Sequence, residues 1–301
     1  MTLTKKKKRI LAELSLLLCG IVWGGGFVVM KSSLDTLPVN YLLGMRFLLA
    51  GGGLLLLIPR RIVRAGKQTL ACGAVAGIAI YIAFYFQTMG LATTTAGNNA
   101  FLTAVYVILV PVMQWMVHRR KPGMNVLVAG VLCLSGVGVI ALNQFSMAIG
   151  DVWTLVGGVF FAAHIVIVAH FTGRGINALE LTCVQLITTG AVALAVAAVM
   201  ETPPAPAVLV SADTVLSLLF LAGVCTLYAM GAQNVSLRYT PASHASLLMG
   251  TEAPFGCLFG ILLLNEPFTL RFFAGALLIA LSIVISEVGH FGKRASAPAK
   301  E

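Results

Sequence analysis

The chain has 301 residues, of which 59% are hydrophobic and 10% charged, whereas soluble globular proteins average about 45–50% and about 25%. This composition excludes an ordinary soluble domain. Since a membrane-spanning helix takes about 20 apolar residues, ten such helices would use roughly two-thirds of the chain and leave only connecting loops.

Ten apolar runs, separated by proline, glycine and charged residues, are long enough to be membrane spans. In chain order the expected spans are Ile10–Val29, Pro38–Ile58, Thr69–Met89, Gly97–Val117, Met124–Leu142, Asp151–Phe171, Leu179–Met200, Asp213–Gln233, Ser243–Leu264 and Phe272–Val288. The first run follows the basic segment Lys5 to Arg9 but has no small-residue cleavage site, so we interpret it as a retained helix and not as a signal peptide.

The basic residues alternate between the two sides of the membrane in the order that ten spans require. With the amino terminus in the cytoplasm, seventeen of the twenty Lys and Arg residues fall in cytoplasmic segments, and only Lys31 and Arg271 fall in outer loops. The net charge of +10 is therefore explained by topology, and we expect no nucleic-acid partner. Both termini are predicted to be cytoplasmic.

The two halves of the chain resemble each other. Gln87 and the segment Ala96-Gly97-Asn98 recur as Gln233 and Ala242-Ser243-His244 at a separation of 146 residues. Lys121-Pro122 and Gly130 correspond to Glu266-Pro267 and Gly275 at 145, and Met45-Arg46-Phe47 corresponds to Val184-Gln185-Leu186 at 139. Because each half has five spans, an odd number, the second half enters the membrane with the opposite orientation. Such inverted repeats commonly hold a solute site near the membrane midplane.

Several motifs resemble those of the drug/metabolite transporter superfamily, in its two-repeat EamA family. They are Trp23-Gly24-Gly25-Gly26-Phe27 with Lys31, Arg46 in the second span, and the stretch from Glu252 through Leu262-Leu263-Leu264-Asn265-Glu266 to Gly275. The resemblance covers about residues 10–288. It implies a ten-helix secondary transporter with cytoplasmic termini, from a family in which many members export amino acids or other small metabolites.

Two departures from the family pattern concern the same motifs. Ala253 separates Glu252 from Pro254, where the family often has Glu-Pro, and Lys121 stands in the first repeat where the second has Glu266. The motifs are specific for the fold and say little about the solute.

Other uses of ten helices find less support. Neither Gly66-Lys67-Gln68 nor Gly292-Lys293-Arg294 forms a phosphate-cradling loop for an ATP-driven pump. An intramembrane enzyme and a channel or signalling protein stay as alternatives, although no paired catalytic acids stand at membrane depth. The six cysteines are widely spaced within apolar runs, so we expect no metal site, no disulfide framework and no cofactor.

Polar residues at membrane depth are the candidate site, because each costs at least about 2–3 kcal/mol if left in lipid. Arg46 is either an anion-binding group or a structural cation paired with carbonyl groups or Glu252. Glu252 lies near the midplane, beside a helix irregularity expected at Pro254. A carboxyl group in a low-dielectric environment holds its proton more tightly, which suits proton coupling. His164 is a second proton-coupling candidate or a packed histidine.

The remaining candidates for the solute path are amides and aromatic residues. They are Trp23, Tyr81, Tyr85, Gln87, Asn98, Asn99, Tyr106, Gln185 and Gln233. Amide side chains in such helices also join neighbouring helices, and Asn98 is placed to cap the fourth span. Aromatic side chains either stack on a solute or pack against their neighbours.

We therefore expect an all-α integral membrane protein with ten transmembrane helices in two inverted five-helix repeats. The expected segments are a basic cytoplasmic amino terminus (1–9), two repeats (10–142 and 151–288) and a cytoplasmic tail (289–301). The expected function is secondary active transport of a small organic solute, an amino acid, related metabolite or drug, across a bacterial-type inner (plasma) membrane. We also expect alternating access, export and proton coupling, and a protein that is a monomer or weak homodimer. The expected partners of the protein are the solute, the lipid bilayer and protons.

Overall fold

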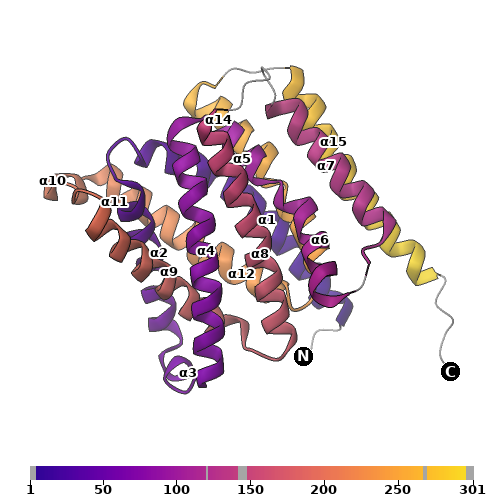
Figure 1. Cartoon of the computed structure of the whole chain (residues 1–301), viewed down its shortest axis with the longest axis horizontal. Helices are drawn as coiled ribbons and strands as arrows, with labels where there is room; N and C mark the ends of the chain where they lie inside the picture. The colour runs from indigo at the N-terminus through magenta and orange to yellow at the C-terminus, as the bar shows by residue number, and fades with distance from the viewer. Residues whose placement is uncertain (1–4, 120, 142–147, 267–269, 296–301) are drawn as a thin grey trace.

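The computed structural model describes residues 5–119, 121–141, 148–266 and 270–295, and every regular element in these ranges is a helix (Figure 1). The helices are α1 (Lys5–Ser33), α2 (Val39–Leu57), α3 (Pro59–Val63), α4 (Lys67–Thr93), α5 (Ala96–Thr103), α6 (Tyr106–His118), α7 (Met124–Ala141), α8 (Ile149–Gly173), α9 (Ala178–Met200), α10 (Pro206–Leu209), α11 (Ala212–Leu219), the π-helix η1 (Phe220–Tyr228), α12 (Ala229–Ser236), α13 (Ala242–Met249), α14 (Glu252–Leu264) and α15 (Leu270–Ala295). Several parts of the sequence prediction fall outside these ranges: residues 1–4 of the amino-terminal segment, Arg120, Leu142, Pro267 and residues 296–301 of the tail.

Eight helical segments of the described chain are long and apolar enough to cross a membrane. They coincide with the first four and the sixth to ninth predicted spans. Two shorter apolar helical stretches, Met124–Gly136 and Phe273–Ser282, lie within the predicted fifth and tenth spans. Many large apolar side chains point outward, such as Leu56, Leu216 and Leu277, as a lipid environment allows. The count of ten stays a prediction.

The fourth and ninth spans are each interrupted, and the interruptions stand at equivalent places. α5 ends at Thr103 and α6 begins at Tyr106, while α13 ends at Met249 and α14 begins at Glu252, 146 residues further on. Thr103 donates its hydroxyl hydrogen to the carbonyl of Asn99 (2.8 Å), a contact that bends helices. Pro254 occupies the first turn of α14, where its missing N–H is tolerated. The irregularity expected beside Glu252 is present, just before that residue.

The eighth span contains a feature that the sequence did not indicate. Its central nine residues form the π-helix η1 between α11 and α12. The hydroxyl of Thr226 in η1 donates to the carbonyl of Leu221, five residues earlier (2.7 Å). π-helical turns are rare and often mark functional sites, because they expose backbone groups that an α-helix would use internally.

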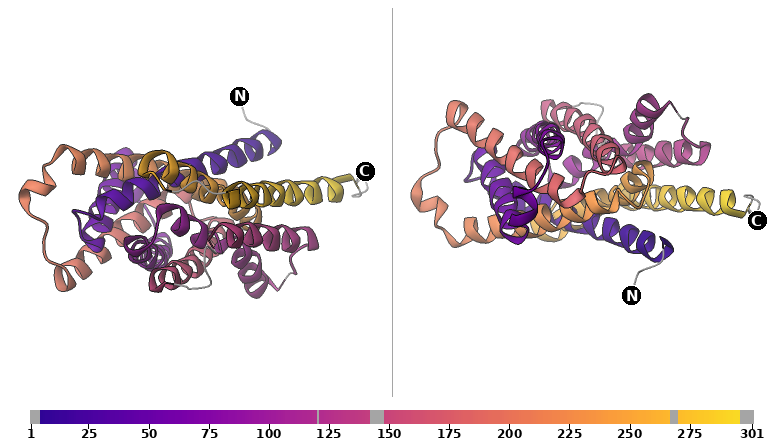
Figure 2. Two further views of the ribbon diagram at one scale, coloured as in Figure 1. Left: turned by 90° about the horizontal axis from the view of Figure 1, so that it is seen from above. Right: turned by 90° about the horizontal axis from the view of Figure 1, so that it is seen from below.

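The two halves of the chain pack through matching elements. α2 lies along α9, and α7 lies along α15, a pair that runs side by side at one flank of the molecule (Figures 1 and 2). α1 packs on α12, α13 and α14 of the second half, as α8 packs on α4, α5 and α6 of the first. Each half therefore contributes its first helix to the other half.

Individual contacts repeat in the same way. The thiol of Cys19 in α1 donates to the carbonyl of Ala229 (3.3 Å). At the equivalent place, Gly157 in α8 lies so close to Ala83 that an added Cβ would stand 2.9 Å from the Ala83 carbonyl oxygen. Cys19 and Gly157 are 138 residues apart, and Ala83 and Ala229 are 146 apart. These two separations relate the first helices and the third and fourth spans of the two halves.

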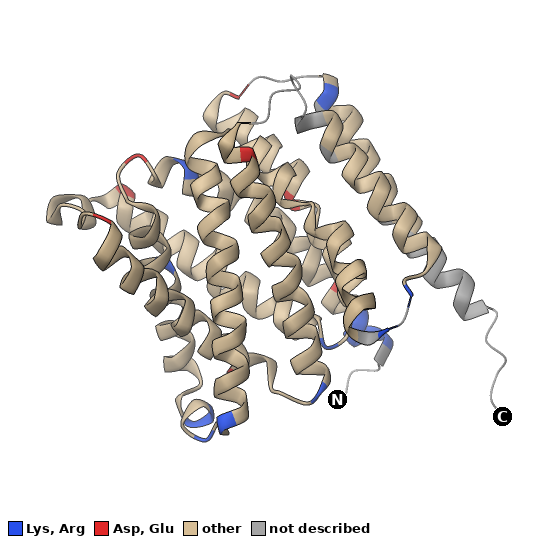
Figure 3. Cartoon of the chain, in the orientation of Figure 1, with Lys and Arg blue, Asp and Glu red and all other residues tan. Residues whose placement is uncertain are grey.

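The charged residues are unevenly distributed along the molecule. In Figure 3 most Lys and Arg residues gather at the lower end, where α1 begins, and most Asp and Glu residues lie in the upper half. The sequence predicts that basic residues collect on the cytoplasmic side of the membrane, and this orientation stays a prediction.

Candidate functional site

A cavity lies between the two halves of the chain. Its walls come from α1, α2, α4, α8 and the interrupted fourth, eighth and ninth spans. The lining residues are Trp23, Gly26, Phe27, Met30, Arg46, Ile80, Phe84, Gln87, Thr103, Tyr106, Phe161, His164, Ile165, Cys225, Met230, Gln233, Met249 and Glu252.

Most of this lining consists of residue pairs related by the internal repeat. The pairs Trp23/Phe161, Gly26/His164 and Phe27/Ile165 are 138 residues apart. The pairs Phe84/Met230, Gln87/Gln233, Thr103/Met249 and Tyr106/Glu252 are 146 apart. The cavity thus lies at the interface between the repeats, where inverted-repeat transporters hold their solutes.

Arg46 brings a buried positive charge to the cavity wall. Its side chain is 2% exposed. Nε donates to the hydroxyl of Thr226 (2.6 Å), and Nη1 donates to the thioether sulfur of Met30 (2.9 Å). The guanidinium also lies over the rings of Phe84 and Phe47, 4.8 and 5.3 Å from their centres.

No carboxylate compensates this charge in the described part of the chain, where the ion pairs are Arg9–Glu13 and Glu13–His244. The structural alternative of an Arg46–Glu252 pair is therefore not formed. A guanidinium with neutral partners keeps its affinity for an anion, so Arg46 is suited to bind an acidic group of a solute.

Glu252 is the acidic group of the same cavity. It is the first residue of α14 and 5% exposed. Its carboxyl group lies beside the side chain of Tyr106, and its Oε1 atom has no hydrogen-bond partner among the described residues. A buried carboxyl oxygen without a partner is costly, so this oxygen is available to a proton or to a solute donor.

His164, in α8, lines the cavity and contacts Gln185, which does not line it. Its Nε2 atom lies 3.2 Å from Oε1 of Gln185, with the tautomer set by that contact. Within the described ranges, His164 Nδ1 and Gln185 Nε2 have no hydrogen-bond partner. Gln185 itself does not line the cavity; it positions His164.

The side-chain amides of Gln87 and Gln233, which occupy equivalent positions in the two repeats, also line the cavity. Gln87 donates from Nε2 to the hydroxyl of Thr103 (3.0 Å). Nδ2 of Asn99 donates to the backbone carbonyl of Gln87 (3.1 Å) and to the hydroxyl of Thr154 (2.7 Å). Gln233 contacts Asn234 (3.5 Å). Asn99 is thus a supporting residue behind the wall.

Trp23 is fixed by the π-helix. Its indole Nε1 donates to the carbonyl of Cys225 in η1 (2.7 Å). Together with the hydroxyl of Thr226 that holds Arg46, this contact makes η1 the element that positions two cavity residues. Neither η1 nor Thr226 was predicted, because a π-helix depends on tertiary contacts that leave no pattern in the sequence.

Besides Gln185 and Asn99, three further predicted path residues lie away from the cavity wall. The hydroxyl of Tyr81 donates to Oδ1 of Asn40 (2.9 Å), and the ring of Tyr85 packs against those of Tyr81 and Phe86. Asn98 donates from Nδ2 to Asp151 (2.7 Å). Asn98 does not cap α5 with its side chain: Thr95 is the capping residue and accepts from the backbone N–H of Asn98 (3.1 Å).

Comparisons with known proteins point in one direction. The model of the EamA-like transporter family matches residues 10–142 and 148–287. An uncharacterized transporter of Archaeoglobus fulgidus is 32% identical over 92% of this chain and 86% of its own. The uncharacterized transporter YvbV of Bacillus subtilis is 27% identical over 92% of both chains. A solved crystal structure matches with a TM-score of 0.76 over 95% of this chain and 99% of its own, at 14% identity, which shows a shared fold alone.

Proposed function

Because the chain belongs to the EamA-like transporter family, we propose that it is a secondary transporter that moves a small organic solute through the cavity between its repeats. The protein is an integral multi-pass membrane protein of a transporter family. The identity of the solute, the coupling ion and the direction of transport are proposals.

The charges of the cavity favour a solute with both a carboxylate and an amino group. Arg46 offers a guanidinium without an acidic partner, and Glu252 offers a carboxyl oxygen without a donor. Trp23, Phe84 and Phe161 provide apolar surface beside them. An amino acid or a related metabolite with an apolar side chain satisfies all three features; an amphipathic drug satisfies the aromatic walls and one charge.

The proposed topology has ten transmembrane helices, with α7 and α15 as the fifth helix of each inverted repeat. The clustering of basic residues at the end of the molecule where α1 begins supports cytoplasmic termini (Figure 3). The proposed location is a bacterial-type inner (plasma) membrane, and the proposed assembly is a monomer or weak homodimer.

The proposed mechanism is alternating access driven by protons. Glu252 would carry the coupling proton, since its carboxyl group is buried at the cavity wall and its Oε1 atom has no hydrogen-bond partner among the described residues. A proton on Glu252 and a cationic group of the solute would compete for the same oxygens. His164 is the second candidate for this role. Export is the proposed direction, because the family includes many exporters.

The observation that supports this proposal most strongly is a single cavity that is lined by pairs of repeat-related residues and contains both Arg46 and Glu252. The test is a thermal-shift screen of the purified protein against amino acids, nucleosides and amphipathic toxins, because a bound solute stabilises the state that binds it. Each hit then enters a counterflow assay in proteoliposomes. Saturable exchange supports the proposal; conductance without saturation, or chemical turnover in detergent, would replace it with a channel or an enzyme.

A further inference from the structure

Two polar contacts outside the cavity join helices from different repeats. The first lies at the beginning of α8. Oδ1 of Asp151 accepts from Nδ2 of Asn98 in the first turn of α5 (2.7 Å) and from the hydroxyl of Thr94 (3.4 Å). Oδ2 of Asp151 accepts from the backbone N–H of Ala148 (3.0 Å). This contact, Asp151–Asn98, fastens α5 to α8.

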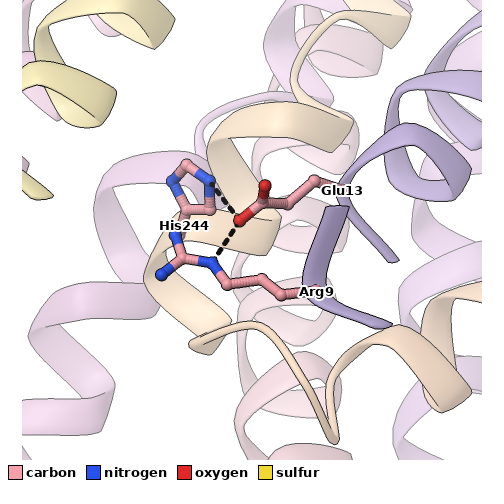
Figure 4. A network of polar contacts seen from close by, with 3 residues as sticks. All are labelled: Arg9, Glu13 and His244. Carbon is pink, nitrogen blue, oxygen red and sulfur yellow. Dashed lines mark hydrogen bonds and ion pairs between the residues drawn. The ribbon is translucent and has the colours of Figure 1, made fainter. Parts of the chain in front are cut away.

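The second contact lies near the beginning of α1 and is drawn in Figure 4. Oε1 of Glu13 lies 3.6 Å from Nε2 of His244, which is in the first turn of α13. The same oxygen accepts from Nε of Arg9, one turn earlier in α1. His244 is 1% exposed and Glu13 is partly buried, so the contact is shielded from bulk water. This contact, Glu13–His244, fastens α13 to α1.

The two contacts occupy equivalent places in the two repeats. Glu13 and Asp151 are 138 residues apart, and Asn98 and His244 are 146 apart. These are the separations that relate the paired residues of the cavity wall. In each contact a carboxylate on the first helix of one repeat faces the third residue of the interrupted span of the other repeat: Asp151 is hydrogen-bonded to Asn98, and Glu13 lies 3.6 Å from Nε2 of His244. α1 begins at the lower end of the molecule in Figure 1 and α8 at the upper end, so the contacts lie at opposite ends of it.

Each contact holds one end of a short helix whose other end is an interruption at the cavity. α5 and α13 both have eight residues, and the interruptions after them lead directly to Tyr106 and Glu252. At the interruptions the first helices touch through glycine: an added Cβ at Gly20 would stand 3.2 Å from the backbone nitrogen of Glu252, and one at Gly158 would stand 3.1 Å from the Thr103 carbonyl oxygen. A helix fixed at the interruption and released at its outer end is free to swing away from the cavity.

We propose that Asp151–Asn98 and Glu13–His244 are the two gates of the transporter, one for each side of the membrane. This proposal rests on the proposed transport function. When Asp151–Asn98 opens, α5 moves and the cavity is exposed at the end where α8 begins. When Glu13–His244 opens, α13 moves and the cavity is exposed at the end where α1 begins. The structure holds both contacts closed.

The gate at α5 has an additional carboxylate beside it. The carboxylate of Glu266, at the end of α14, also accepts from the backbone N–H groups of Ala96 (2.8 Å) and Gly97 (3.3 Å) at the start of α5. In the first repeat, Lys121 stands at the position that corresponds to Glu266, at the separation of 145. The first repeat therefore has no carboxylate at the position from which Glu266 contacts α5.

The test uses Cys225, which lines the cavity, as the only cysteine of the chain, with the other five replaced by alanine. An impermeant maleimide is applied to sealed vesicles of each orientation, without solute. Asp151→Ala should raise the rate of Cys225 labelling from the side where α8 begins about fivefold and lower it from the opposite side, since opening one gate shifts the population between states. Glu13→Ala should do the reverse.

Matched controls are Asp213→Ala, an exposed acid in the first turn of α11, and Glu180→Ala in the first turn of α9; both should leave labelling unchanged. If an acid variant fails to fold, Asn98→Ala and His244→Ala open the same gates from their partner side. Equal labelling changes from both sides, or no change in any gate variant, would overturn the proposal. The labelling experiment measures the accessibility of Cys225 and uses no solute. If the gate variants label from one side as expected but no solute is transported in the counterflow assay, the transport function is rejected and the two gates are retained.

Discussion

The hydroxyl of Tyr106 lies beside the carboxyl group of Glu252 inside the cavity, and the two residues occupy the same position in the two repeats, 146 residues apart. Each is the first residue after the interruption of its span. The repeat therefore places a donor and an acid at one point between the two halves. This pair links the internal symmetry to the chemistry proposed for coupling.

Replacing Tyr106 by phenylalanine tests that link. Tyr106→Phe keeps the ring but removes the hydroxyl that lies beside the buried Glu252 carboxyl group, and loss of a polar neighbour there costs about 1–3 kcal/mol. We expect a lower unfolding temperature in detergent and weaker proton-driven transport, with solute binding retained. Tyr228→Phe, at a half-exposed tyrosine of η1, is the control. Unaltered transport in Tyr106→Phe would separate Tyr106 from coupling.

Arg46 should select solutes by their carboxylate. Arg46→Lys retains the charge but loses the planar fork, so some transport of acidic solutes should remain. Arg46→Ala should weaken binding of carboxylate-bearing solutes by at least tenfold while affecting neutral analogues less, as measured by competition in a binding assay. Equal losses for both kinds of solute, together with poor expression, would indicate that Arg46 is structural.

The glycine triplet of α1 provides a test of the packing between the repeats. An added Cβ at Gly24 would stand 2.8 Å from the backbone nitrogen of Gly256 in α14, whereas one at Gly25 would make ordinary contacts with the rings of Phe259 (3.8 Å) and Phe220 (4.0 Å). Gly24→Ala should therefore force α1 and α14 apart and destabilise the protein by about 1–3 kcal/mol. Gly25→Ala should be tolerated. Thermal unfolding of both variants checks this, and similar stability would contradict the close approach.

The proposed topology predicts which loops a reagent can reach. In a background without native cysteines, a cysteine at Pro204, between α9 and α10, should react with an impermeant thiol reagent applied to intact cells. A cysteine at Gly123, just before α7, should react only after permeabilisation. Labelling of position 123 from outside would reject ten helices with cytoplasmic termini.

The sequence alone predicted the helical spans and several cavity residues for identifiable reasons. Arg46 and Glu252 were recognisable because a charge at membrane depth is costly. Gln87 and Gln233 were recognisable because they recur in both repeats. The family resemblance is confirmed by the match to the EamA-like model.

Other residues were beyond sequence reasoning. Tyr81 and Gln185 lie on helices that are apolar on every side, so periodicity does not tell which side faces the cavity. Tyr81 instead contacts Asn40, and Gln185 supports His164. Thr226 became significant only because η1 turns its hydroxyl toward Arg46. Glu13 and Asp151 looked like separate acids near helix ends until contacts showed their partners on the other repeat.

The central claim is that Glu252 carries the proton that drives solute through this cavity, and one variant tests it most directly. Glu252→Gln removes the ionisable group while keeping its shape. In proteoliposomes with only a pH gradient, we predict that Glu252→Gln no longer concentrates the solute, while solute binding and equilibrium counterflow stay near those of the unmodified protein. Accumulation of solute against its gradient by Glu252→Gln under the same pH gradient would contradict the account and make His164 or a sodium ion the better candidate.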